Sequence, residues 1–81
     1  MTLGEAFTIR FNQLLEEKGI SLHKFVKDNC IARSTIVNIL KGNTKVPSLS
    51  VIYQVANGFN MTYLQFLDCE SFKSEEIDYL S

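Results

Sequence analysis

Apolar residues recur along the chain at the spacing of an α-helix, beginning near the N-terminus. The first group falls at positions i, i+4, i+7 and i+8 and comprises Phe7, Phe11, Leu14 and Leu15. This spacing forms one apolar stripe and predicts a helix over about residues 3–18. Gly19 predicts the end of that helix, because glycine adopts the left-handed conformation at little cost.

Two shorter helices are predicted next, joined by a tight turn at residues 29–31. Ser21 suits the N-cap of the first, whose inward-facing residues are Leu22, Phe25 and Val26. The second covers about residues 32–41 and is ended by Gly42. Its apolar side carries Ile36, Ile39 and Leu40, and its other side carries Arg33, Ser34 and Asn38. A polar helix face supported by a preceding helix is what enters the major groove of DNA.

A polar loop at residues 43–47, which contains the only proline of the chain, precedes a fourth helix. Ser48 suits the N-cap of this helix, and Phe59 marks its approximate end. The expected buried face comprises Leu49, Ile52, Val55 and Ala56. Asn60 is predicted to follow in the left-handed conformation.

A capping box, Thr62-x-x-Gln65, predicts a fifth, short helix that runs through Leu67. Residues 69–81 are acidic and weakly patterned, so we expect a short C-terminal tail after a domain at residues 1–68. The pattern as a whole predicts an all-α fold, a compact five-helix bundle around one core.

Length and composition limit the classes of protein to consider. Eighty-one residues, 46% of them hydrophobic, suffice for a single domain with one core. No run approaches the roughly 18 apolar residues that a membrane span requires. The N-terminus also lacks the basic start of a signal peptide. We therefore expect a cytoplasmic protein that does not associate with membranes.

Charge is distributed unevenly behind a net charge of −1. Residues 1–57 hold seven bases and four acids, whereas residues 58–81 hold one base and five acids. Within residues 21–47 the five bases face a single acid. Positive charge is thus concentrated where DNA contact is expected. A solvated face followed by an acidic tail remains an equally good reading of charge alone.

The residues that usually carry metal binding or catalysis are sparse. Cys30 and Cys69 stand 39 positions apart, and His23 is the only histidine, so no metal-ligand spacing occurs. The cysteines are expected to be reduced thiols; a redox-sensing Cys30 is the alternative and would require a lowered thiol pKa. No paired-carboxylate motif or glycine-rich phosphate loop is present. We expect neither an enzyme nor a cofactor, metal or small-molecule ligand.

Three consecutive pieces of the chain match one known pattern: RFNQLLEEKGIS, then FVKDNCIARSTIVNILKGNTKVPSL, then IYQVANGFNMTYLQFL. Their order and spacing, without insertion, resemble the Cro/C1-type helix-turn-helix family, the phage-repressor and XRE-like regulators. The resemblance covers residues 10–67. It implies a lambda-repressor-like fold, a helix-turn-helix formed by helices 2 and 3, and double-stranded DNA as the partner.

The resemblance also implies which residues contact DNA. The positions that match the base-reading face of the family are Ala32, Arg33, Ser34, Val37 and Asn38. Arginine pairs bidentately with guanine and asparagine with adenine, while small apolar side chains contact the thymine methyl group. The positions that match phosphate contacts are Ser21, Thr35, Lys41, Asn43, Thr44 and Lys45. These residues are expected to fix the register of the protein on DNA.

The chain departs from the family at several positions. Leu22 replaces a common glutamine, Ala32 a common serine cap, and Cys30 a common glycine in the turn. A left-handed Cys30 would carry about 1 kcal/mol of strain. Leu15 and Leu40 replace a partly buried arginine–glutamate pair. Because both partners are replaced, we expect helices one and three still to pack together.

Apolar residues at positions expected to face solvent suggest a further contact. Leu64 and Ile9 are so placed, and Val51 and Tyr53 add apolar area. Family members commonly form homodimers that match palindromic operators. We therefore expect a homodimer, with contacts from the fifth helix and the tail: Leu64, Ile77, Tyr79 and Leu80.

The function expected from these features is sequence-specific DNA binding by a small, repressor-like transcriptional regulator that acts by operator occupancy. The alternative is a protein-interaction module or regulator subunit on the same fold, with weak or lapsed DNA binding. The low net charge, Leu22 and the exposed apolar residues favour that alternative.

Overall fold

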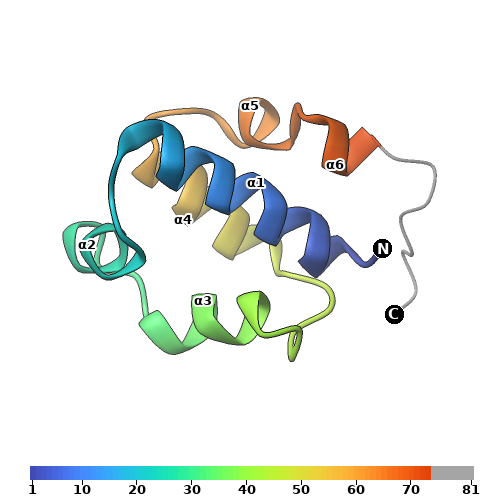
Figure 1. Ribbon diagram of the computed structural model, residues 1–81, viewed down its shortest axis with the longest axis horizontal. Helices are drawn as coiled ribbons and strands as arrows, with labels where there is room; N and C mark the ends of the chain where they lie inside the picture. The colour runs from blue at the N-terminus through green and yellow to red at the C-terminus, as the bar shows by residue number, and fades with distance from the viewer. Residues whose placement is uncertain (74–81) are drawn as a thin grey trace.

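Six α-helices form the part of the chain that the computed structural model describes, residues 1–73 (Figure 1). In chain order they are α1 (Leu3–Lys18), α2 (Leu22–Asp28), α3 (Arg33–Leu40), α4 (Leu49–Gly58), α5 (Tyr63–Leu67) and α6 (Glu70–Lys73). The first five are the predicted helices, and the all-α class is confirmed. The sixth is additional and lies within the segment expected to be a tail.

The helices begin at the predicted capping residues. The side-chain oxygens of Ser21, Ser48 and Thr62 each accept a hydrogen bond from a backbone N–H in the first turn of their helix. Thr62 and Gln65 complete the expected capping box, with Gln65 Oε1 accepting from Thr62 N at 2.8 Å. Each such cap stabilises its helix by about 1 kcal/mol. At α3, Ala32 makes no side-chain cap, as its sequence predicts.

The helices also end as predicted. Gly19 and Gly42 have φ angles of 64° and 83°, and Asn60 has a φ of 59°. Cys30, in the turn between α2 and α3, has a φ of 54°. It therefore adopts the left-handed conformation that its position requires, at a cost of roughly 1 kcal/mol for a residue with a Cβ.

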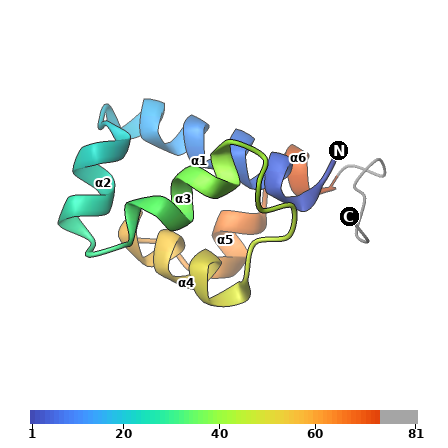
Figure 2. The ribbon, with the colours of Figure 1, turned by 90° about the horizontal axis from the view of Figure 1, so that it is seen from below.

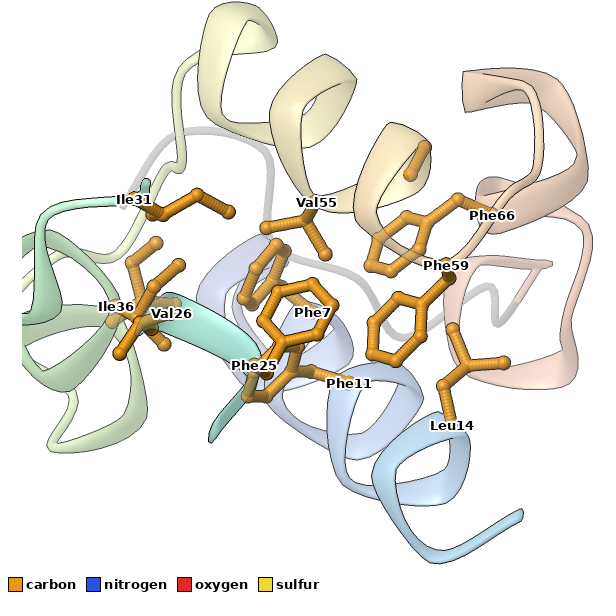
Figure 3. Close-up of a cluster of buried hydrophobic side chains, with 12 residues drawn as sticks. Phe7, Phe11, Leu14, Phe25, Val26, Ile31, Ile36, Val55, Phe59 and Phe66 are labelled. Carbon is orange, nitrogen blue, oxygen red and sulfur yellow. The ribbon is translucent and has the colours of Figure 1, made fainter. Parts of the chain in front are cut away.

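The core is built largely from phenylalanine rings contributed by three helices (α1, α2 and α5) and by the C-terminal end of α4 (Figure 3). The rings of Phe25 and Phe59 stack with centroids 4.3 Å apart, and Phe11 meets Phe25 edge-on at 5.3 Å. Val55 and Ile36 fill the space beside them and are fully buried. Edge-on and offset rings add specific attraction to the burial of their area.

The predicted buried faces agree with this core except at one residue. Leu49 was expected on the buried face of α4, but 58% of its surface is exposed. It is the first residue of α4, so it lies beyond the edge of the core cluster that Val55 and Ala56 join one to two turns later. Leu15 and Leu40 are half-buried against the core, and α1 contacts α3 as expected.

The extra helix α6 packs on α1. Ser71 is buried, and its Oγ donates to the carbonyl of Ala6 at 3.2 Å. Phe72 packs against the core beside Phe66, with ring centroids 6.1 Å apart. Local pattern does not predict a four-residue helix, because its formation depends on these tertiary contacts. The division of the chain at residue 68 stays a prediction.

The arrangement leaves α3 at the surface. In Figure 1, α3 lies along one edge of the molecule, α5 and α6 lie along the opposite edge, and α1 and α4 lie between them. Figure 2 shows the molecule from the α3 side, with α1 on one flank of α3 and α4 on the other. Within residues 1–73, no helix is long and apolar enough to cross a membrane.

Candidate nucleic-acid interface

The outer face of α3 is exposed and mostly polar. Ile36 and Ile39 point into the core, with 0% and 2% of their surfaces exposed. The residues expected to read bases lie on the other side of the helix: Ala32, Arg33, Ser34 and Asn38 are exposed and Val37 is half-buried. The fold therefore brings all five to one accessible surface that no helix within residues 1–73 covers (Figure 2).

A short, hydrogen-bonded turn fixes α3 relative to α2. The N–H of Ile31 donates to the carbonyl of Val26 at 3.1 Å, and the side-chain amide of Asn29 donates to the carbonyl of Phe25 at 2.8 Å. Ile31 is itself buried in the core. Because the turn is tied both to α2 and to the core, the outer face of α3 is held at a fixed angle to its supporting helix.

The N-terminus of α2 presents Ser21 at the surface. Its Oγ accepts a hydrogen bond from the N–H of Lys24 at 3.1 Å. A hydroxyl that accepts in this way retains its own O–H as a donor. Capping α2 and donating to a phosphate are therefore compatible roles for Ser21. Leu22, next in the chain, is half-buried and packs against the core.

The loop after α3 places the other expected phosphate contacts beside the outer face. The N–H groups of Asn43 and Thr44 both donate to the carbonyl of Asn38, at 2.9 and 3.1 Å. Lys41, Asn43 and Lys45 are exposed, and Thr44 is half-buried. The loop therefore extends the surface of α3 instead of folding away from it.

Thr35 lies at the margin of the exposed face of α3. It is half-buried and lines a hollow of about 280 Å³ between α3, the loop and the start of α4. Asn38, Thr44 and Ser48 line the same hollow. Thr35 thus sits where the expected base-reading and phosphate-contacting residues meet, at the edge of the surface and not at its centre.

The cations near α3 are accessible, whereas two others are engaged elsewhere. Within residues 1–73 the ion pairs are Lys24–Asp28 at 2.9 Å and Lys73–Asp68 at 2.6 Å. Arg33, Lys41 and Lys45 pair with no acid in that part of the chain. Arg33, Lys41 and Lys45 are thus exposed cations on α3 and the segment after it, in a chain whose net charge is −1.

Arg10 has a role that sequence reasoning missed. Its Nε donates to the carbonyl of Phe66 and its second guanidinium nitrogen donates to the carbonyl of Gln65, both at 2.9 Å. Arg10 therefore caps the C-terminal end of α5 and ties it to α1, a favourable place for a cation. The sequence signal for this role is that Arg10 lies beside Phe7 and Phe11, at the margin of the apolar stripe that packs into the core.

The expected dimer contacts are described only in part. Leu64, on α5, is 64% exposed. Tyr53 on α4 is 45% exposed and its ring lies 4.6 Å from that of Tyr63 on α5. The helix α5 itself lies along the edge of the molecule opposite α3 (Figure 1). Ile77, Tyr79 and Leu80 lie outside the described residues.

The fold and this surface define a class: an all-α domain in which a supporting helix and a tight turn present an exposed second helix. The chain belongs to the helix-turn-helix domain family of the Cro/C1 type, whose family model matches residues 8–68. Among curated proteins, none matches the chain. Membership indicates a DNA-binding regulator, and domains of this type are typically non-enzymatic.

Proposed function

We propose that the protein is a sequence-specific, repressor-like transcriptional regulator of the cytoplasm that acts by occupying an operator in double-stranded DNA. The observation that carries the proposal is the exposed, mostly polar face of α3, flanked by Lys41 at the helix end and by Lys45 in the loop that follows. Occupancy of the operator would exclude other proteins from the same site. Selection of bound DNA from a random library tests the proposal directly.

Each proposed base-reading residue suits a different base contact. Arg33 offers the paired donors that match the acceptors of guanine, and Asn38 the donor and acceptor that match adenine. Ala32 and Val37 offer small apolar surfaces for a thymine methyl group, and Ser34 offers a hydroxyl. Each good bidentate pair contributes about 1–3 kcal/mol of discrimination.

The proposed phosphate contacts supply affinity without specificity. These contacts come from two segments of the chain. The first is the start of α2, with Ser21, and the second is the segment around the loop, with Thr35, Lys41, Asn43, Thr44 and Lys45. Every phosphate neutralised releases condensed counterions, so the affinity falls as salt rises. The slope of log affinity against log salt steepens by about 0.9 for each phosphate that is neutralised.

We further propose that the protein binds a palindromic operator as a homodimer. The support is the exposed apolar area on α5 and α4, where 64% of Leu64 and 45% of Tyr53 are exposed. A two-fold dimer through that area would leave both copies of α3 free for DNA. Binding to two half-sites about one helical turn of DNA apart further requires the dimer to present both copies of α3 on the same side.

A protein-interaction module is the second candidate function. The same exposed leucine, the half-buried Leu22 at the start of α2 and the low net charge favour it. Lack of any mobility shift with DNA at low salt, together with stable capture of one protein partner, would support this candidate over DNA binding.

A further inference from the structure

The loop that carries Thr44 and Lys45 crosses the first turn of α1 (Figure 2). There the N–H of Gly4 donates to the carbonyl of Lys45 at 2.7 Å. This bond joins residues 41 positions apart, and it uses one of the N–H groups that a helix start leaves without an intrahelical partner. The other side of the loop is fixed to α3 through the carbonyl of Asn38. The loop is therefore held between α3 and α1.

The contact at Gly4 is too close for any side chain. A Cβ added at Gly4 would lie 2.5 Å from the carbonyl oxygen of Thr44 and 3.2 Å from that of Lys45. Both atoms belong to the backbone, so relief requires the loop or the first turn of α1 to move. Gly19 and Gly42 have left-handed backbones, and a Cβ added at either would meet nothing within 4 Å. Gly4 does not have a left-handed backbone, so at this position the close contact is what excludes a side chain.

The first turn of α1 does not itself serve as an anion site. Thr2 Oγ1 accepts from the N–H of Glu5 at 3.1 Å, and Glu5 Oε1 accepts from the N–H of Thr2 at 2.9 Å. The hydrogen bond from the backbone of Thr2 lowers the pKa of Glu5, so a carboxylate occupies this helix end at neutral pH. The first turn of α1 therefore serves to hold the loop that carries Thr44 and Lys45.

We propose that Gly4 is a positioning residue for DNA binding: its close contact sets where Thr44 and Lys45 meet the phosphate backbone. The inference rests on the proposed function, since those two residues are among the proposed phosphate contacts. It extends the DNA-binding unit from the helix-turn-helix to the first turn of α1.

The test is Gly4→Ala, measured by DNA affinity across a salt series. We expect the affinity to fall about tenfold for every sequence, the salt slope to become shallower by about one, and the preferred sequence to stay unchanged. A matched destabilising control is Val55→Ala, which truncates a fully buried core side chain and should leave the salt slope unaltered. Lys45→Ala measures the full effect of losing that contact.

A double variant shows whether Gly4 acts through Lys45. In Gly4→Ala/Lys45→Ala the loss of affinity should be smaller than the sum of the two single losses. Should Gly4→Ala fail to fold, Thr2→Ala replaces it, because loss of the cap loosens the first turn without a clash. We expect it to shift the slope in the same direction by a smaller amount.

Two outcomes separate this inference from the proposed function. Wild-type protein that binds no DNA at low salt would remove both. If wild-type protein binds DNA but the salt slope of Gly4→Ala equals that of wild type or of Val55→Ala, the role of Gly4 is overturned and the proposed function stands.

Discussion

Arg10 offers the sharpest test of how the fold is held together. Its guanidinium donates to the carbonyls of Gln65 and Phe66, and so it joins α5 to α1. A hydrogen bond to a charged group contributes about 1.5–3 kcal/mol, and the bond to Gln65 is exposed and therefore weaker. We expect Arg10→Ala to lower the free energy of unfolding by about 2–3 kcal/mol.

A loss of that size is large for this chain. Domains of about this length have unfolding free energies of roughly 4–12 kcal/mol, so the variant should lose a substantial share. The midpoint of thermal unfolding should fall by roughly 10–20 °C. Urea unfolding followed by circular dichroism measures the free energy, and Arg10→Lys, which keeps the charge but not the paired donors, should fall between wild type and alanine.

The same variant separates structure from DNA contact. At a temperature where Arg10→Ala is fully folded, its salt slope for DNA should equal that of wild type, because the guanidinium is engaged with α5. Unchanged stability combined with a shallower salt slope would refute this reasoning and place Arg10 among the phosphate contacts.

Three further predictions concern the surface. Arg33→Ala should cost about 1–3 kcal/mol of binding and relax specificity at one base position, whereas Lys45→Ala should weaken all sequences alike; binding to a panel of single-base operator variants distinguishes them. Leu64→Glu should give a monomer in sedimentation at tens of micromolar without a change in stability, and a persistent dimer would exclude α5 as the contact. The hydrogen bond from Lys73 and then its charge lower the pKa of Asp68, so the stability that Asp68→Asn removes should be present above pH 4 and shrink as the pH falls below the ordinary value of 3.8; acid titrations of both proteins measure it.

The sequence predicts most of the fold because the signals involved are local. Serine and threonine caps, glycine and Asn60 at helix ends, and apolar spacing each act within one or two turns. The conformation of Cys30 is also determined locally, because a turn of this length needs a left-handed residue whichever side chain occupies the position. The exposure of the polar face of α3 follows directly from burial of Ile36 and Ile39 on the opposite side.

The features that sequence reasoning missed depend on contacts between distant segments. Helix α6 forms where Ser71 and Phe72 meet α1 and α5. From the sequence, Arg10 is only one of the seven bases of residues 1–57, because its partners lie 55 and 56 positions away. The need for glycine at position 4 becomes visible only when the loop at Thr44 lies against it. Leu49 fits the apolar spacing of α4, but the core ends before it.

Selection of DNA from a random double-stranded library, followed by affinity measurement on the enriched sequence, tests the central claim most directly. The account predicts one enriched motif, palindromic with half-sites about one helical turn apart, and loss of preference at a guanine position in Arg33→Ala. Enrichment of no motif, with equal and weak binding to all sequences at low salt, would contradict it.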